Sequence, residues 1–246
     1  MTPKEYESYY VPAQSHWPIV GAVALFLIAI GAGEYVSTIN VEEAGWGGWV
    51  LLAGIALVIY MVVGWFGNVI DESMAGKYSP QMDQSFKQGM SWFIFSEVMF
   101  FAAFFGALLY ARVFSVPWLD GAGNNFMTGE VLWPDFQASW PLTKTPDGTE
   151  TTAMGWYGLP LINTVILMTS SVTAHFAHVA LEQDKRGALK TWLGITVLLG
   201  LIFLTLQVEE YIHAYNELNL TLASGIYGNT FFLLTGFHGL HVTLGT

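Results

Sequence analysis

The sequence GMSWFIFSEVMFFAAFFGALLYAR at Gly89–Arg112 is almost free of polar side chains. Between Gly89 and Ala111 its one ionisable residue is Glu97. About 20 apolar residues suffice for a helix to cross the hydrocarbon core of a bilayer, so this stretch predicts a transmembrane helix. Glu97 would lie roughly 12 Å from one end of that helix. A charged carboxylate is costly there, so we expect Glu97 to be protonated or bonded to a polar group of a neighbouring helix.

The composition of the whole chain agrees with a membrane protein. Of its 246 residues, 53% are hydrophobic and only 11% are charged, against about 25% charged in a typical soluble domain. The net charge of −11 argues against nucleic acid as a partner. The chain has no cysteine, which excludes disulfides, thiolate metal sites and thiol catalysis.

Six apolar spans make up most of the chain. They cover residues 18–38, 48–70, 89–111, 158–181, 189–213 and 227–246. The segment 115–157 is rich in Pro, Trp, Gly and Asp and shows no periodicity, so we expect a folded-back loop on the outer face. The last span is still apolar at Thr246, and we expect a further C-terminal part. The pattern predicts an all-α, polytopic helix bundle that forms a single integral membrane domain.

The basic residues predict the orientation of this bundle, because cytoplasmic loops carry an excess of Lys and Arg. With the N-terminus in the cytoplasm, only Arg112 and Lys144 fall outside. The other basic residues fall inside: Lys4, Lys77, Lys87, Lys185, Arg186 and Lys190. We therefore expect an integral protein of a bacterial inner membrane with a cytoplasmic N-terminus.

Small residues indicate where helices could pack closely. Two pairs at four-residue spacing, Ala102/Gly106 and Ala103/Ala107, lie in the Glu97 span, and Gly31/Gly33 lie in the first span. Membrane helices approach each other most closely at such positions. We expect helix–helix contacts there.

Four polar residues are expected at similar depth in the inner half of the bilayer: Glu97, His175, His238 and His241. His178 would lie nearer the cytoplasmic surface. A structural hydrogen-bond network explains them better than a metal site, since a di-iron bundle needs several carboxylates and this layer has one. Haem ligation by two of the histidines is allowed by their spacing, but nothing in the sequence specifies it.

Proton transfer through this layer is a further hypothesis, because an isolated carboxylate in a membrane span is a functional candidate. His175, His178 and Thr173 offer a route towards the cytoplasm. Four aromatic residues close the outward side of Glu97: Phe100, Phe101, Phe104 and Phe105. A pump running through this chain is therefore disfavoured. Near the outer end of the fifth span, Glu209 and Glu210 are most simply interfacial residues.

Several strings of the sequence resemble subunit III of the haem-copper cytochrome c oxidases. They are HWP at 16–18, VIDES at 69–73, GMSWFIFSEVMFF at 89–101, PLINT at 160–164, TAHFAHVALE at 173–182, TLQVEEY at 205–211 and GIYGNTFFLLTGFHGLHVTLGT at 225–246. The last string is the most specific. The resemblance covers nearly every span and leaves mainly the loop 115–157 unmatched.

The resemblance implies a cofactor-free accessory subunit with seven helices in two bundles and a V-shaped, lipid-filled cleft between them. It implies oxidase subunits I and II as partners, with haem and copper on those subunits, and cytochrome c as a partner of the complex. It also implies structural phospholipids and support of oxygen access and proton uptake. The chain itself would carry no catalytic or metal-ligating residue.

The resemblance also assigns individual residues. The intramembrane glutamate of the family corresponds to Glu97, and a histidine of the fourth span corresponds to His178. The family strings further include Gln207, Glu210 and Tyr211, which are candidates for subunit contacts, and His238 and His241. Trp65, His238 and His241 are candidates for lipid contacts. His175 is not expected from the family. At residues 65–72 the chain reads WFGNVIDE where many relatives read WWRDVIRE, which removes arginines that could bind a lipid phosphate.

Three alternatives remain open. A ubiquinol oxidase would use a similar subunit, although that branch commonly lacks the first two helices, which are present here. A small secondary transporter would show internal repeats and broken helices, and none is evident. A membrane metalloenzyme would use Glu97 and the histidines. We expect part of a proton-pumping terminal oxidase that reduces oxygen to water.

Overall fold

A computed structural model describes residues 10–38 and 45–246 of the chain. Lys4, which entered the orientation argument, lies outside these residues. The described part is helical, and its only extended pairing is the isolated antiparallel bridge between Lys144 and Glu150. This confirms the predicted all-α class.

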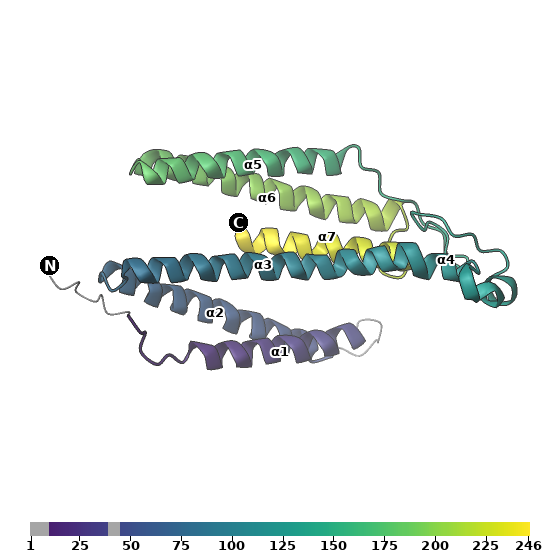
Figure 1. The fold of residues 1–246 in the computed structure, drawn as a ribbon, viewed down its shortest axis with the longest axis horizontal. Coiled ribbons are helices and arrows are strands. Elements are labelled where there is room, and N and C mark those ends of the chain that lie inside the picture. The colour runs from purple at the N-terminus through teal and green to yellow at the C-terminus, as the bar shows by residue number, and fades with distance from the viewer. Residues whose placement is uncertain (1–9, 39–44) are drawn as a thin grey trace, which may run out of the picture. The chain divides into compact units, whose positions relative to one another are not determined.

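Long helices occupy all six predicted spans (Figure 1). They are α1 (Trp17–Thr38), α2 (Gly47–Met74), α3 (Pro80–Tyr110), α5 (Leu159–Glu182), α6 (Arg186–Glu217) and α7 (Ile226–Gly245). Within the described residues, five helices are long and apolar enough to cross a membrane, and α7 is not among them. The crossing by α7 therefore stays a prediction.

The helix around Glu97 is longer than its apolar stretch. It begins at Pro80, where the Ser79 hydroxyl oxygen accepts a hydrogen bond from the Met82 amide at 3.3 Å. At the other end α3 continues through a π-helical turn, Ala111–Ser115, into the short α4, Val116–Leu119. Polar residues at 80–88 form helix as readily as apolar ones. Apolarity marks the part of a helix that fits the membrane, and it does not mark the helix ends.

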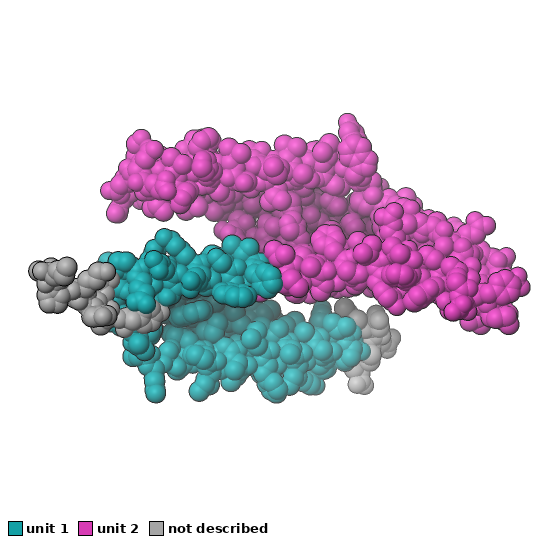
Figure 2. Space-filling view, in the orientation of Figure 1, with its two compact units in different colours: residues 1–95 teal, residues 96–246 magenta. Residues whose placement is uncertain are grey.

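The chain divides into two compact units, residues 1–95 and 96–246 (Figure 2). The first contains α1, α2 and the beginning of α3, and the second contains the rest. The single membrane domain and the V-shaped cleft stay predictions.

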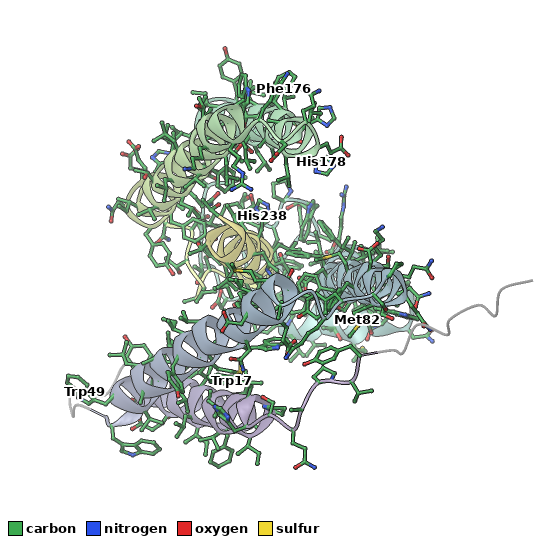
Figure 3. All side chains as sticks on the ribbon, turned by 90° about the vertical axis from the view of Figure 1, so that its left-hand side faces the viewer. Trp17, Trp49, Met82, Phe176, His178 and His238 are labelled. Carbon is green, nitrogen blue, oxygen red and sulfur yellow. The ribbon has the colours of Figure 1, made fainter. Side chains whose placement is uncertain are left out.

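In the first unit, α1 and α2 pack through residues without bulky side chains. A Cβ placed on Gly31 would lie 2.4 Å from the Leu51 amide nitrogen, and one placed on Gly54 would lie 2.9 Å from the Ile28 nitrogen. Small residues thus allow the two backbones to touch. Trp17 covers Gly64, while Trp49 is exposed and points away from the helix pair (Figure 3).

The other predicted small-residue contacts are not found within the unit that contains each residue, and contacts beyond that unit stay predictions. A Cβ on Gly33 or Gly106 would meet no atom within 4 Å. Ala102, Ala103 and Ala107 are exposed. Small residues permit close packing but do not create it, because a partner helix must reach that face.

In the second unit, α5 and α6 lie side by side and antiparallel (Figure 1). The hydroxyl oxygens of Thr173 and Thr196 are 2.7 Å apart across this pair. The rings of Phe176 and Trp192 are 5.0 Å apart near the same end of the pair.

The loop 115–157 has short helical turns and a small core of its own. The turns are α4, a 3-10 turn at Gly123–Asn125 and a π turn at Thr128–Leu132. Val116, Phe136 and Leu142 form the buried cluster. Arg112 lies over the Trp140 ring at 5.9 Å. The lack of periodicity predicted a loop, but its apolar residues still bury one another.

A tight turn in this loop gives a testable acid sensitivity. The Thr145 hydroxyl and the Thr149 amide both donate to Asp147 Oδ1, and these bonds, Thr145 first, lower the pKa of Asp147. A carboxylate with a lowered folded pKa stabilises the fold above its unfolded pKa of about 4, and this is lost as the pH falls through the folded value. We expect Thr145→Val to increase amide exchange at 145–149 at neutral pH. In the wild type that increase should appear only below about pH 4. Equal exchange in the two proteins at pH 7 would contradict this assignment.

Candidate functional site

Glu97 of α3 has its polar partner on α7. Its Oε2 lies 2.5 Å from Nε2 of His241. The other ring nitrogen of His241, Nδ1, lies 2.6 Å from the Phe237 carbonyl oxygen. The sequence predicted a polar partner for Glu97 on a neighbouring helix. That partner is His241, which lies 144 residues further along the chain.

The hydrogen bond to Phe237 determines how many protons the pair holds. A carbonyl oxygen only accepts, so Nδ1 must carry a proton and donate it. Nε2 then faces Glu97 either as a lone pair opposite a carboxylic acid or as an N–H opposite a carboxylate. In both arrangements one proton lies between the two groups, and the pair has no net charge. A neutral pair is the form that a low-dielectric surrounding favours.

Aromatic rings surround this pair along α3 and α7. The centroids of the Phe100 and Phe101 rings lie 5.5 and 5.2 Å from that of His241. Phe237 lies one helical turn before His241 in α7. The centroid of its ring is 5.2 Å from that of Phe100 and 5.1 Å from that of Phe104. Three of the four aromatic residues expected on the outward side of Glu97, namely Phe100, Phe101 and Phe104, therefore pack α3 against α7.

His238 faces a different neighbour. Its ring stands edge-on to the Phe203 ring of α6, with centroids 5.7 Å apart. Figure 3 shows it on α7 within the second unit. His238 and His241 are three residues apart, yet one contacts α6 and the other contacts α3.

The two histidines of α5 do not join the Glu97 pair. His175 is exposed, and its ring contacts that of Phe176 at 6.2 Å. The side chain of His178 is 65% exposed and lies 3.4 Å from Glu182, one turn along the same helix (Figure 3). Similar depth along two helices does not bring side chains together, because each side chain also points in a fixed direction around its helix. Roles for His175 and His178 stay predictions.

The candidates for subunit contact on α6 lie within the second unit. The Tyr211 hydroxyl is 2.7 Å from the Thr235 hydroxyl of α7. Gln207 has a buried Nε2 without a hydrogen-bond partner in the described part of the chain. Glu210 is only 6% exposed. The chain before α5 covers this face of α6, so Glu210 is not the exposed side chain that an interfacial residue would suggest, and its place at the interface stays a prediction.

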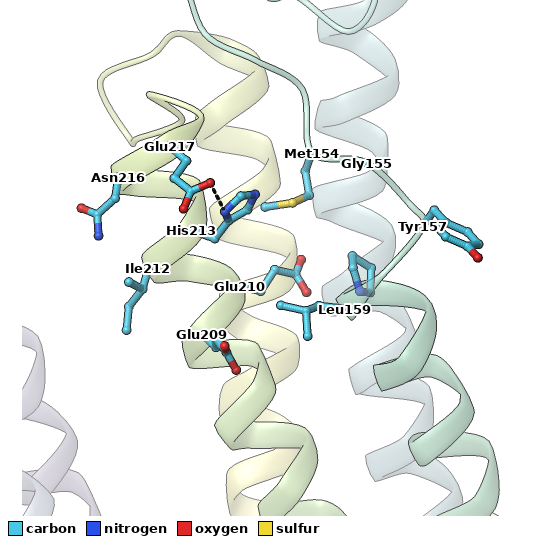
Figure 4. A pocket seen from close by; sticks show the side chains of 11 residues that line it. Met154, Gly155, Tyr157, Leu159, Glu209, Glu210, Ile212, His213, Asn216 and Glu217 are labelled. Atoms are coloured by element: carbon cyan, nitrogen blue, oxygen red, sulfur yellow. Dashed lines mark ion pairs between the residues drawn. The ribbon is translucent and has the colours of Figure 1, made fainter.

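Glu210 lines a cavity of about 520 Å³ at this end of α5 and α6 (Figure 4). Apolar side chains supply part of the wall: Met154, Leu159, Pro160 and Ile212. Polar side chains supply the rest: Tyr157, Glu209, Glu210, His213, Asn216 and Glu217. His213 Nδ1 lies 3.0 Å from Glu217 Oε2. Apolarity and motif matching did not reveal this cavity, because the loop and two helices build it jointly.

A buried amide was also missed by sequence reasoning. Asn163 of α5 is 3% exposed, and neither polar atom of its side chain has a hydrogen-bond partner in the described residues. The antiparallel pairing of Thr173 with Thr196 places Asn163 at the level of Gln207. Gln207 lies between Phe203 and Tyr211 on the face of α6 that contacts α7, so the two unsatisfied amides need not face each other.

Trp65, the remaining lipid candidate, lies in the first unit. It lines a cavity of about 390 Å³ together with His16, Trp17 and Tyr78. Trp17 Nε1 is buried without a partner in the described residues. Tyr78 donates to Glu72 at 2.9 Å, and burial, followed by this hydrogen bond, raises the pKa of Tyr78. The lipid role of Trp65 stays a prediction.

The described residues contain no group of three or more His, Cys, Asp or Glu that could hold a metal ion. The absence of a cofactor from this chain stays a prediction. The chemistry that the geometry supports is sharing of one proton at Glu97 and His241, together with binding of a cation at the Glu210 cavity.

Comparison with known proteins identifies the family. The family model for cytochrome c oxidase subunit III matches residues 7–123 and 131–246. Cytochrome c oxidase subunit 3 of Polypterus ornatipinnis is 33% identical over 240 residues, which are 97% of this chain and 79% of the relative. The probable cytochrome c oxidase subunit 3 of Rickettsia prowazekii (strain Madrid E) is 34% identical over 239 residues, which are 97% of this chain and 77% of the relative. The chain belongs to the cytochrome c oxidase subunit III family.

Proposed function

We propose that this chain is the accessory subunit III of a proton-pumping terminal oxidase that oxidises cytochrome c and reduces oxygen to water. It stabilises catalytic subunit I, contacts subunit II, binds phospholipids and supports oxygen access and proton uptake. The observation that carries the proposal is the Glu97–His241 pair, since both residues lie in the strings that match the family. The haem and copper of the complex belong to the partner subunits.

The Glu97–His241 pair supports two roles, namely binding a proton and joining α3 to α7. It argues against conduction of protons through the chain. Its two groups hold one proton between them. The rings of Phe100, Phe104 and Phe237 pack together next to the pair. Aromatic rings offer no titratable group to pass a proton on, which supports a role in proton uptake over conduction through the chain.

The orientation follows from the ends of the helices. Lys77 lies between α2 and α3, and Lys185 and Arg186 lie where α5 ends and α6 begins. Arg112 and Lys144 lie at the opposite end of α3 and in the loop that follows it. The bias of basic residues supports a cytoplasmic N-terminus, and the proposal puts the chain in a bacterial inner membrane.

Two features support finer assignments. Helices α1 and α2 precede the Glu97 helix, which favours a cytochrome c oxidase over a ubiquinol oxidase as the parent complex. Trp65, His238 and His241 stay the candidates for lipid contacts. Gln207, Glu210 and Tyr211 stay the candidates for subunit contacts, although the Tyr211 hydroxyl already has a partner in Thr235.

Purification of the complex from its native membrane in mild detergent tests this proposal. We expect the chain to co-purify with a subunit that carries haem and copper, and we expect the chain to retain no metal after separation. Extraction of bound phospholipid should loosen its attachment. A haem-free homo-oligomer would contradict the proposal in favour of a transporter, and metal retained by this chain alone would favour a metalloenzyme.

A further inference from the structure

The Glu210 cavity contains a buried acidic group without a counterpart. Glu210 is 94% buried by its surroundings, and Figure 4 shows its carboxylate directed into the cavity between Met154 and Leu159. The described residues give this carboxylate no hydrogen bond and no ion pair. A buried carboxylate without a partner is costly, so its position indicates that a ligand supplies the missing donors.

The charges around the cavity indicate a positively charged ligand. Glu209, Glu210 and Glu217 contribute carboxylates, and no Lys or Arg lines the cavity. The basic side chain that lines the cavity is His213, whose Nδ1 already lies 3.0 Å from Glu217 Oε2. The acidic groups therefore outnumber the basic ones, and Glu210 is left to a cation from outside the chain.

The number of acidic and imidazole groups that lie close together distinguishes a site for a metal ion from a site for an organic cation. The described residues hold no cluster of three or more acidic or imidazole groups close enough to bind a metal ion. An ammonium group needs no such cluster, since it donates three separate hydrogen bonds. One buried carboxylate and the nearby polar groups are sufficient for it.

The apolar part of the wall indicates an amphipathic ligand. Met154, Leu159, Pro160 and Ile212 line the cavity beside the carboxylates. Tyr157 is exposed at the rim, as is typical of aromatic side chains at a membrane–water interface.

We propose that this cavity binds the headgroup of an aminophospholipid, with the primary ammonium group on Glu210. The lipid phosphate would then lie near His213, whose ring can donate a hydrogen bond. The acyl chains would follow the apolar wall formed by Met154, Leu159 and Pro160. The inference rests on the membrane location in the proposed function, and it adds a lipid site that is separate from Trp65, His238 and His241.

A photoreactive phosphatidylethanolamine with its crosslinker beside the headgroup tests the site in the purified, delipidated complex. We expect crosslinks in the peptides that contain residues 154–160 and 209–217. Unlabelled phosphatidylethanolamine should compete, whereas phosphatidylglycerol with the same acyl chains should compete about tenfold less well. Equal competition by the two lipids would overturn the proposal, because only one of them has an ammonium group.

Variants of two glutamates sharpen this test. We expect Glu210→Gln to weaken phosphatidylethanolamine binding about tenfold, because the amide loses the charge that strengthens the hydrogen bond. Glu182→Gln is the matched control, since Glu182 is an exposed glutamate of the same unit that does not line the cavity. Its binding should stay within about twofold of the wild type. Equal losses in the two variants would contradict a specific role of Glu210.

Two other outcomes separate this inference from the proposed function. If Glu210→Gln leaves lipid labelling unchanged but releases an oxidase subunit, a basic side chain of that subunit occupies the cavity and the lipid proposal is wrong. If Glu210→Gln does not assemble, the lipid competition on the wild-type complex decides alone. Co-purification with the haem-carrying subunit is scored separately, so an assembled complex without crosslinks contradicts only the lipid site.

Discussion

Glu97→Leu is expected to loosen this subunit from the oxidase complex while leaving haem content and initial turnover nearly unchanged. Leucine cannot donate to or accept from His241, so Nε2 is left without a partner among the rings of Phe100 and Phe101. An unsatisfied polar group in such a place costs about 1–3 kcal/mol. Retention of the subunit under increasing detergent should fall about tenfold, and activity should decay sooner during prolonged turnover.

Glu97→Gln is the matched control for this variant. The N–H at Nδ1 of His241 donates to the Phe237 carbonyl oxygen, so Nε2 of the neutral ring carries a lone pair. This lone pair can accept a hydrogen bond from the amide group of the glutamine. We expect the complex to retain the Glu97→Gln subunit about as well as the wild type. The glutamine side chain, however, has no titratable proton. Proton uptake at high turnover should therefore slow in Glu97→Gln even though the subunit stays bound. Loss of haem insertion in either variant would contradict an accessory role.

A double-mutant cycle with His241→Leu isolates the pair. Each single leucine variant leaves one polar group unpaired, whereas Glu97→Leu/His241→Leu removes both. We expect the double variant to retain the subunit better than the sum of the single losses predicts. Additive losses would show that the 2.5 Å contact contributes nothing to attachment.

Gly31→Ala is expected to disrupt the α1–α2 pair. The added Cβ would lie 2.4 Å from the Leu51 amide nitrogen and 2.8 Å from the Leu51 Cα. These are backbone atoms, so the helices themselves must separate, at a cost of about 1–3 kcal/mol or more. We expect a lower melting temperature in detergent and faster proteolysis of the segment that contains α1.

Gly33→Ala, two residues further along the same helix, is the control. A Cβ at Gly33 meets nothing within 4 Å, and alanine favours a helix over glycine by about 1 kcal/mol. The melting temperature should therefore be unchanged or slightly higher. If the two variants behave alike, the close approach of α1 and α2 at Leu51 is incorrect.

The sequence predicted the helices better than their contacts. All six apolar spans are helical, because twenty or so apolar residues must satisfy their backbone groups internally in a membrane. The need of Glu97 for a polar partner also followed from its surroundings. The sequence did not show which histidine is the partner of Glu97, because His175, His238 and His241 were expected at comparable depth. In the structure only His241 of these three is directed at Glu97.

The loop and its neighbourhood show the same limit. Nothing in residues 115–157 predicted the cluster of Val116, Phe136 and Leu142, because these residues follow no helical or strand period. Glu210 looked like an ordinary interfacial residue near the end of a span. It is buried because Met154–Pro160 return over α6, and that arrangement depends on how the loop folds.

The sequence by itself therefore determined the membrane class, the helical spans and the presence of an acidic residue that needs a partner. These properties depend on hydrophobicity along the chain, which is local. The tertiary structure decided the Glu97–His241 pair, the separation of His238 from it and the cavity at Glu210. Those properties depend on how each helix is rotated about its axis and which helix lies against it, and packing between distant residues sets both.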